Sequence, residues 1–244
     1  MPLSTHLPAQ ELDLVLLDLP GHGHSAWLPV GAEYTLSSAI AILLQVADGL
    51  GWQRFTLLGH SMGGGIASLL AAAAPERVEA LIAIEALGAL AEPVENTATR
   101  LRDAVASART LAERPLRVFP SMEMPVRARM MANQLTEPAA RLLVERGVRV
   151  VEGGYSWCSD PRLTLPTAIR MTEAQIDVLL ASIACPAQAI FATPAQPYFP
   201  EALRDHRVAM MRDARLQLLP GTHHVHMEMP EAVAAVIDDF LDHN

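Results

Sequence analysis

Phe55-Thr-Leu-Leu-Gly59-His-Ser61-Met-Gly63-Gly-Gly65 is the stretch that decides the fold of this chain. A short apolar run leads into a glycine-rich turn, and an alanine-rich segment with helical character follows from Met62 to Ala74. Serine between two glycines, at the point where a buried strand turns into a helix, is the G-x-S-x-G pattern that lifts a hydroxyl clear of a sheet. The pattern predicts that Ser61 is a nucleophile.

The chemistry of this turn follows from its shape. A tight turn leaves no room for a β-carbon beside the serine, so we expect glycine to be required at both Gly59 and Gly63. Ser61 then lies at the N-terminus of a helix, where free N–H groups and the helix dipole stabilise negative charge. The N–H of Met62 is the predicted oxyanion donor. The alternative is a glycine-rich helix start with no chemistry.

Strands and helices alternate on both sides of this stretch. The expected strands cover residues 12–18, 55–58, 78–84, 187–192 and 215–219, and the expected helices cover residues 35–50, 62–74, 200–211 and 230–241. Such alternation implies parallel strands joined by right-handed helical crossovers. The predicted fold class is therefore α/β, with a mostly parallel sheet flanked by helices.

The segment from residue 89 to residue 181 has a different pattern. It is mostly helical, with helices expected over residues 99–113 and 137–146. We interpret it as a helical cap inserted into a core formed by residues 1–88 and 182–244. Its Tyr155 and Trp157 are weak candidates for substrate contact, as is His60 beside the nucleophile. Met171 could line the same pocket, although aromatic and methionine side chains at such positions more often serve packing.

Composition excludes several classes of function. The 244 residues carry a net charge of −9, which argues against a nucleic-acid-binding surface. No apolar run approaches the roughly 20 residues that span a bilayer. Residues 1–10 lack the pattern of a secretory signal, so we expect a cytoplasmic location without membrane association. Cys158 and Cys185 have the spacing of neither a metal site nor a redox pair, and we expect free thiols.

A serine hydroxyl needs a base within hydrogen-bonding reach, and histidine is the expected one. Three candidates, His223, His224 and His226, follow the last predicted strand. The order of serine before histidine is the one used by hydrolases with a strand–turn–helix nucleophile. At least two of the three must be ordinary loop histidines that bond to backbone or solvent.

From about Leu12 to the C-terminus the chain resembles the α/β-hydrolase family. The matching motifs, in the family's order, are Asp-Leu-Pro-Gly-His-Gly-His-Ser at 18–25, Gly-His-Ser-Met-Gly-Gly at 59–64 and the terminal His-x-x-x-x-Glu-x-Pro. The cap segment 142–147, followed by Gly153-Gly154, is most similar to that of the serine hydrolase-like proteins. The resemblance implies hydrolysis of an ester or similar acyl bond in a small molecule, without metal or organic cofactor.

The resemblance also implies partners for Ser61. The family's catalytic histidine lies five positions before the glutamate of the terminal motif, which selects His223, with His224 next and His226 as a residue of the helix approach. The family's usual acid follows the strand expected at 187–192, where residues 192–197 contain no carboxylate. Some relatives instead place the acid after the strand that follows the nucleophile helix, which is Glu85 here.

Glu85 has a structural alternative, in which it bonds loop N–H groups. Other carboxylates are weaker candidates for the acid: Glu201 and Asp160 are reserves, and Asp18 is expected to fix its own glycine-rich turn.

Family members carry further strands, and a His-Gly turn with a second oxyanion donor, before the strand expected at 12–18. Either the strands at 12–18 and 55–58 pair directly, another chain fills the gap as in a homo-oligomer, or the chain begins upstream. We favour an incomplete chain. A missing oxyanion donor alone costs roughly 10²–10³ in rate. One alternative to an esterase is therefore a non-catalytic protein that binds a ligand or partner. Another is a C–C bond or thioester hydrolase, because the same three catalytic residues support that chemistry.

Overall fold

The computed structural model describes residues 3–7, 12–112 and 116–244. Its contacts divide the chain into two compact units. The first consists of residues 1–12, 36–95 and 170–244, and the second of residues 13–35 and 96–169. The second unit thus contains an early segment of the chain as well as the region between the core strands.

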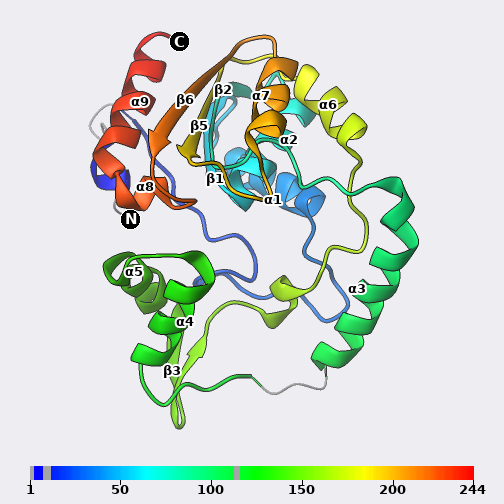
Figure 1. Ribbon diagram of the computed structural model, residues 1–244, viewed down its shortest axis with the longest axis vertical. Helices are drawn as coiled ribbons and strands as arrows, with labels where there is room; N and C mark the ends of the chain where they lie inside the picture. The colour runs from blue at the N-terminus through cyan, green and yellow to red at the C-terminus, as the bar shows by residue number, and fades with distance from the viewer. Residues whose placement is uncertain (1–2, 8–11, 113–115) are drawn as a thin grey trace. The chain divides into compact units, whose positions relative to one another are not determined.

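The first unit contains a four-stranded parallel sheet (Figure 1). The strands, in the spatial order β1-β2-β5-β6, are β1 (Phe55–His60), β2 (Val78–Ile84), β5 (Ala187–Thr193) and β6 (Ala214–Pro220). The helices are α1 (Leu36–Gly49), α2 (Met62–Ala73), α6 (Glu173–Ala181), α7 (Glu201–Met210), α8 (Val225–Glu228) and α9 (Pro230–Asp242), with short 3₁₀ turns at Leu3–Thr5 and Val94–Asn96. The α/β class predicted from the alternation is confirmed.

Both faces of the central strands β2 and β5 are buried, which explains their apolar runs in the sequence. Leu81 and Ala83 of β2 pack into a cluster with residues of α1, α2 and α6. Ile82 and Ile84, on the opposite face, pack against α9 and the Val225 side chain. Figure 1 shows the same layering, with α1, α2, α6 and α7 on one side of the sheet and α9 on the other.

The second unit is mainly helical, with one hairpin. Its elements are α3 (Thr97–Ala112), α4 (Glu123–Asn133), α5 (Glu137–Gly147), the antiparallel strands β3 (Val148–Val151) and β4 (Gly154–Trp157), and a 3₁₀ turn at Pro161–Thr164. Phe119, Val126 and Val144 are almost fully buried. The helices at 99–113 and 137–146 were predicted, the end of the first lying outside the described residues, whereas the hairpin was not.

The predicted strand at residues 12–18 is wrong. These residues have no regular secondary structure, and Leu16 is 64% exposed. A strand is stabilised by the ladder to its neighbour, and the described sheet begins at β1 with no strand on that side. Residues 13–35 instead make polar contacts within the second unit, where Asp18 accepts a bond from Arg146 at 2.8 Å and the Trp27 indole donates to the carbonyl of Cys158 at 2.9 Å.

Asp18 fixes its own turn, as predicted. The His24 N–H donates to its carboxylate at 3.0 Å, and the Ser25 hydroxyl donates to its carbonyl oxygen at 2.6 Å. Gly23, inside the loop, has a φ of +50°, and a β-carbon there would lie 2.3 Å from the Asp18 carboxylate. The glycine-rich turn is therefore built around this side chain.

Candidate active site

Three of the predicted site residues meet at the carboxyl ends of the parallel strands. Ser61 follows β1, Glu85 follows β2 and His223 follows β6. The Nε2 atom of His223 lies 2.9 Å from the Ser61 hydroxyl oxygen. The Nδ1 atom of the same ring lies 3.1 Å from Oε2 of Glu85. Hydroxyl, imidazole and carboxylate thus form one continuous hydrogen-bonded chain.

The Ser61 backbone is held in a rarely populated conformation. Its φ of 53° and ψ of −120° lie outside the common regions for residues with a side chain, which is a local source of strain. Its N–H donates to the Ile84 carbonyl at 2.9 Å, and its own carbonyl accepts from Gly65 at 3.0 Å. Met62 is the first residue of α2, so its N–H has no acceptor within the helix.

The two glycines around Ser61 differ in what they require. A β-carbon on Gly59 would lie 2.3 Å from the backbone of Gly63, so no other residue fits without moving the turn. A β-carbon on Gly63 would meet nothing within 4 Å outside its own helix backbone. The expectation that both positions must be glycine is therefore wrong for Gly63, because a side chain at this position would extend into open space.

These two positions provide a matched test of stability. Gly59→Ala is expected to lower the free energy of unfolding by about 2 kcal/mol or more, because the backbone has to shift. Gly63→Ala is expected to be neutral or to stabilise by up to about 1 kcal/mol, because alanine is the better helix former. Urea denaturation of both variants measures the difference, and equal losses would contradict this account of the turn.

Glu85 is 5% exposed and has a φ of 57°. One carboxylate oxygen faces His223, and the other accepts a bond from the N–H of Ala192 at the end of β5. The side chain thus makes both contacts that the sequence left as alternatives, one to the histidine and one to a backbone N–H. Asp160 is instead bonded to Arg162 and Tyr34 in the second unit. Glu201 is exposed at the start of α7.

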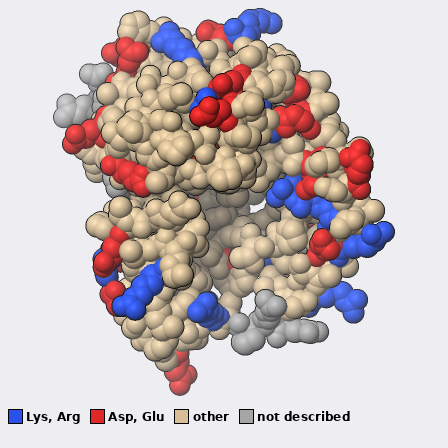
Figure 2. Space-filling model, in the orientation of Figure 1, with Lys and Arg blue, Asp and Glu red and all other residues tan. Residues whose placement is uncertain are grey.

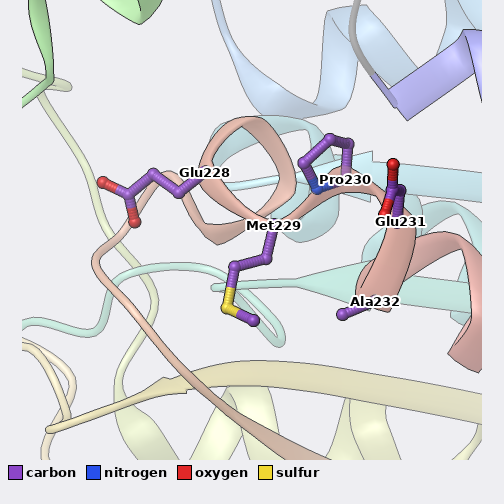
Figure 3. A pocket seen from close by; sticks show the side chains of 5 residues that line it. All are labelled: Glu228, Met229, Pro230, Glu231 and Ala232. Atoms are coloured by element: carbon purple, nitrogen blue, oxygen red, sulfur yellow. The ribbon is translucent and has the colours of Figure 1, made fainter.

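The loop that carries His223 is fixed by Glu228. Its carboxylate accepts bonds from the N–H of Thr222 at 2.9 Å and from the hydroxyl of the same residue at 2.8 Å. Figure 3 shows Glu228 at the end of α8, beside a hollow that Met229, Pro230, Glu231 and Ala232 also line. The glutamate of the terminal motif therefore closes the loop one residue before His223.

Tyr198 is a site residue that sequence reasoning missed. Its hydroxyl lies 2.9 Å from Nδ1 of His223, the atom that also faces Glu85. Burial, and then the charge of Glu85, raise the pKa of Tyr198, so the phenol stays protonated at neutral pH. It lies after β5, close to residues 192–197, where the usual acid is absent. A polar residue close to the usual position of the acid was the feature of the sequence that could have indicated Tyr198.

His224 and His226 form a cluster with His60 beside the Ser61–His223 pair. The ring centroids of His60 and His226 are 4.0 Å apart. The Nε2 atom of His60 lies 2.6 Å from the carbonyl oxygen of His223. Burial, and then the neighbouring His226, lower the pKa of His60 to about 2. Burial, and then His224, lower the pKa of His226 to about 4. Both rings are neutral at pH 7.

These pKa shifts predict acid sensitivity. Below the ordinary pKa of 6.5 these two histidines bind protons in the unfolded chain but stay unprotonated in the folded protein. The free energy of unfolding therefore falls as the pH falls. Between pH 7.5 and pH 5 each ring is expected to account for about 1–2 kcal/mol of lost stability. Chemical denaturation of wild type and His226→Asn at both pH values tests this. The loss should be smaller in His226→Asn and unchanged in His243→Asn, whose ring is exposed.

Comparison with known proteins places the chain in a family. The model of the alpha/beta hydrolase fold family matches residues 2–141. The chain belongs to this family. It is 31% identical to a serine hydrolase-like protein of Danio rerio, covering 93% of this chain and 72% of that protein. It is 28% identical to lipase LipV of Mycobacterium tuberculosis, covering 96% and 85% of the two chains.

A solved structure agrees with this assignment. A hypothetical protein of Pseudomonas aeruginosa superimposes on this α/β-hydrolase with a TM-score of 0.86 and 36% identity, covering 92% of this chain and 80% of that one. The resemblance to the α/β-hydrolases and to the serine hydrolase-like proteins is thereby confirmed. No helix in the described part of the chain is long and apolar enough to span a membrane.

The remaining predicted residues of this α/β-hydrolase lie as follows. Tyr155 and Trp157 are on β4 in the second unit, where the Trp157 ring packs edge-on against Phe119. Their contact with substrate stays a prediction. Cys158 and Cys185 are both free thiols, as expected. On the face drawn in Figure 2, basic and acidic side chains are interspersed.

Proposed function

We propose that this α/β-hydrolase cleaves an ester or similar acyl bond of a small molecule through an acyl-enzyme on Ser61. The observation that carries the proposal is the hydrogen-bonded chain from Ser61 through His223 to Glu85, with separations of 2.9 Å and 3.1 Å. Nucleophile and base lie within hydrogen-bonding reach, and a third group orients the base, which is the arrangement required for covalent catalysis by serine.

The proposed reaction has two steps. The Ser61 oxygen attacks the carbonyl carbon while Nε2 of His223 takes the hydroxyl proton, and the imidazolium then gives this proton to the departing alcohol. Water repeats the sequence on the acyl-enzyme and releases the acid. Glu85 accepts the Nδ1–H of His223, which keeps Nε2 free as the base and stabilises the imidazolium. The N–H of Met62 is the donor we assign to the oxyanion.

Burial elsewhere in the site favours this proton transfer. His60 and His226 are neutral at pH 7, so they do not place a positive charge beside the imidazolium that forms on His223. Tyr198 shares the Nδ1 edge of His223 with Glu85 and can restrict rotation of the ring. We assign Tyr198 a positioning role.

An ester substrate has support from a relative. Among the relatives, the one from M. tuberculosis is named a lipase, which supports an ester substrate. Purified protein should react with a fluorophosphonate probe and hydrolyse p-nitrophenyl esters, with acyl length varied to define the preference. Thioester and C–C substrates belong in the same panel, because the same three residues can cleave them. A folded protein that neither labels nor turns over any substrate would contradict the proposal and favour a non-catalytic binding protein.

A further inference from the structure

We propose that His60, His224 and His226 bind a divalent transition-metal ion of the Zn²⁺ type, and that the bound ion inhibits the neighbouring Ser61–His223 pair. The inhibitory part of this proposal rests on the proposed function, whereas the binding part does not. The three residues come from the end of β1, from the loop after β6 and from α8, so the fold brings His60 beside two histidines that are distant from it in sequence.

The geometry is close to that of a three-histidine site. Each ring offers one nitrogen, and these three nitrogens all lie within 4.8 Å of one another. Zinc–nitrogen bonds of about 2.0–2.1 Å in a tetrahedron place ligand nitrogens roughly 3.3–3.5 Å apart. Side-chain rotations that move each nitrogen by about 1 Å therefore complete the site, and a fourth position is left for water.

Burial supplies a second, independent argument. The Nδ1 atom of His226 is buried and makes no hydrogen bond to the described residues. A buried polar atom left without a partner costs free energy, which a metal ion bound at that nitrogen would recover. His224 is 9% exposed and His60 is partly buried, so the site is largely shielded from solvent.

The donor set selects the kind of ion. The cluster offers three imidazole nitrogens and no carboxylate. Imidazole nitrogen suits Zn²⁺, Co²⁺, Ni²⁺ and Cu²⁺, whereas Mg²⁺ and Ca²⁺ require oxygen ligands. A second group, Glu173, Asp177 and His206, also has closely spaced donors, but His206 already pairs with Asp177 at 2.9 Å and is half exposed. That group is an ordinary surface ion pair and serves as the control.

The position of the ion explains why it would inhibit. His60 is bonded to the His223 carbonyl oxygen at 2.6 Å, and its ring centroid lies 4.7 Å from that of His223. The His60 ring has to rotate to complete the metal site, and this ring holds the backbone of His223. Rotation therefore shifts the loop that carries His223 and disturbs its 2.9 Å contact with the Ser61 hydroxyl. Small displacements of reacting groups cost large factors in rate, so we expect a loss of at least about tenfold at saturating Zn²⁺, restored by EDTA.

The test measures metal binding directly. Isothermal titration of the metal-free chain with ZnCl₂ should show one site, and CoCl₂ should give the visible absorption of four-coordinate Co²⁺ with nitrogen ligands. His226→Asn is expected to weaken Zn²⁺ binding by at least about tenfold, the minimum effect for a lost ligand. His206→Asn should leave the affinity unchanged. Ser61→Ala should bind Zn²⁺ like wild type, which separates the metal site from the proposed activity.

Several outcomes would overturn the inference. Unchanged Zn²⁺ affinity in folded His226→Asn, or a loss of affinity in His206→Asn alone, places the ion elsewhere. Should His226→Asn fail to fold, the Co²⁺ spectrum of the wild-type chain decides, because a purely octahedral spectrum is incompatible with the three-histidine site. Binding at this site without any loss of rate overturns the inhibitory part.

Discussion

Ser61→Ala is expected to abolish fluorophosphonate labelling and to reduce kcat for ester hydrolysis by a factor on the order of 10⁶, the scale found when a serine nucleophile is removed. The hydroxyl oxygen is the atom that forms the acyl bond, and among the described contacts Ser61 supplies the only hydroxyl at Nε2 of His223, since Tyr198 faces Nδ1. Labelling followed by peptide mapping, together with initial rates on a p-nitrophenyl ester, measures both effects.

The matched control is Ser182→Ala. Ser182 follows α6 in the same unit and is exposed, and its hydroxyl bonds only to a helix carbonyl, that of Leu179, among the described contacts. It should label and turn over like wild type. Because Ser61 has a strained backbone, circular dichroism of Ser61→Ala has to show an intact fold for the comparison to hold. Labelling of the folded variant at another serine would contradict the assignment of the nucleophile.

The parallel sheet could be predicted because its strands are short apolar runs, and the two central ones are buried on both faces. The strand at Val78–Ile84 has the bounds expected from its apolar run. The strand expected at 187–192 is one residue longer at its C-terminal end, and the strand expected at 215–219 is one residue longer at both ends. The run at residues 12–18 has the same composition and forms no strand. Apolar composition shows that a segment suits a buried strand, but it does not show that a neighbouring strand is present to pair with it.

The hairpin in the second unit has a weaker pattern in the sequence than the parallel strands have. β3 and β4 have four residues each, and only Ser156 of β4 is buried. Alternation over so few residues is easily mistaken for the end of a helix. Gly153 lies in the turn and Gly154 begins β4, and such a pair of glycines separates two helices as readily as two strands.

The residues of the candidate site differed in how far sequence could locate them. Ser61 lies in a local motif, whereas the selection of His223 depended on a family resemblance that the Glu228–Thr222 bonds now explain. The contact of Tyr198 with His223 and the packing of His60 against His226 could not be predicted, because they depend on how separate loops meet in space.

Glu85→Gln is expected to reduce kcat by roughly 10⁴ while leaving the fold intact. The glutamine carbonyl can still accept the N–H of Ala192, so the buried backbone contact survives. Its NH₂ group then faces Nδ1 of His223 and donates to it, which moves the ring proton to Nε2. An imidazole protonated at Nε2 cannot accept the Ser61 proton, so acylation fails although every distance is nearly preserved. Stopped-flow or steady-state rates on an activated ester, with the unfolding free energy measured in parallel, test this.

Glu201→Gln is the matched control, since Glu201 is an exposed carboxylate of the same unit and one of the two reserve candidates for the acid. It should retain the wild-type rate. A large loss in Glu201→Gln with little effect of Glu85→Gln would move the acid to α7. Equal stability with a lost rate in Glu85→Gln distinguishes the bond to His223 from the bond to Ala192, because only the backbone contact is preserved by glutamine. A rate within about tenfold of wild type would mean that Glu85 serves the fold alone.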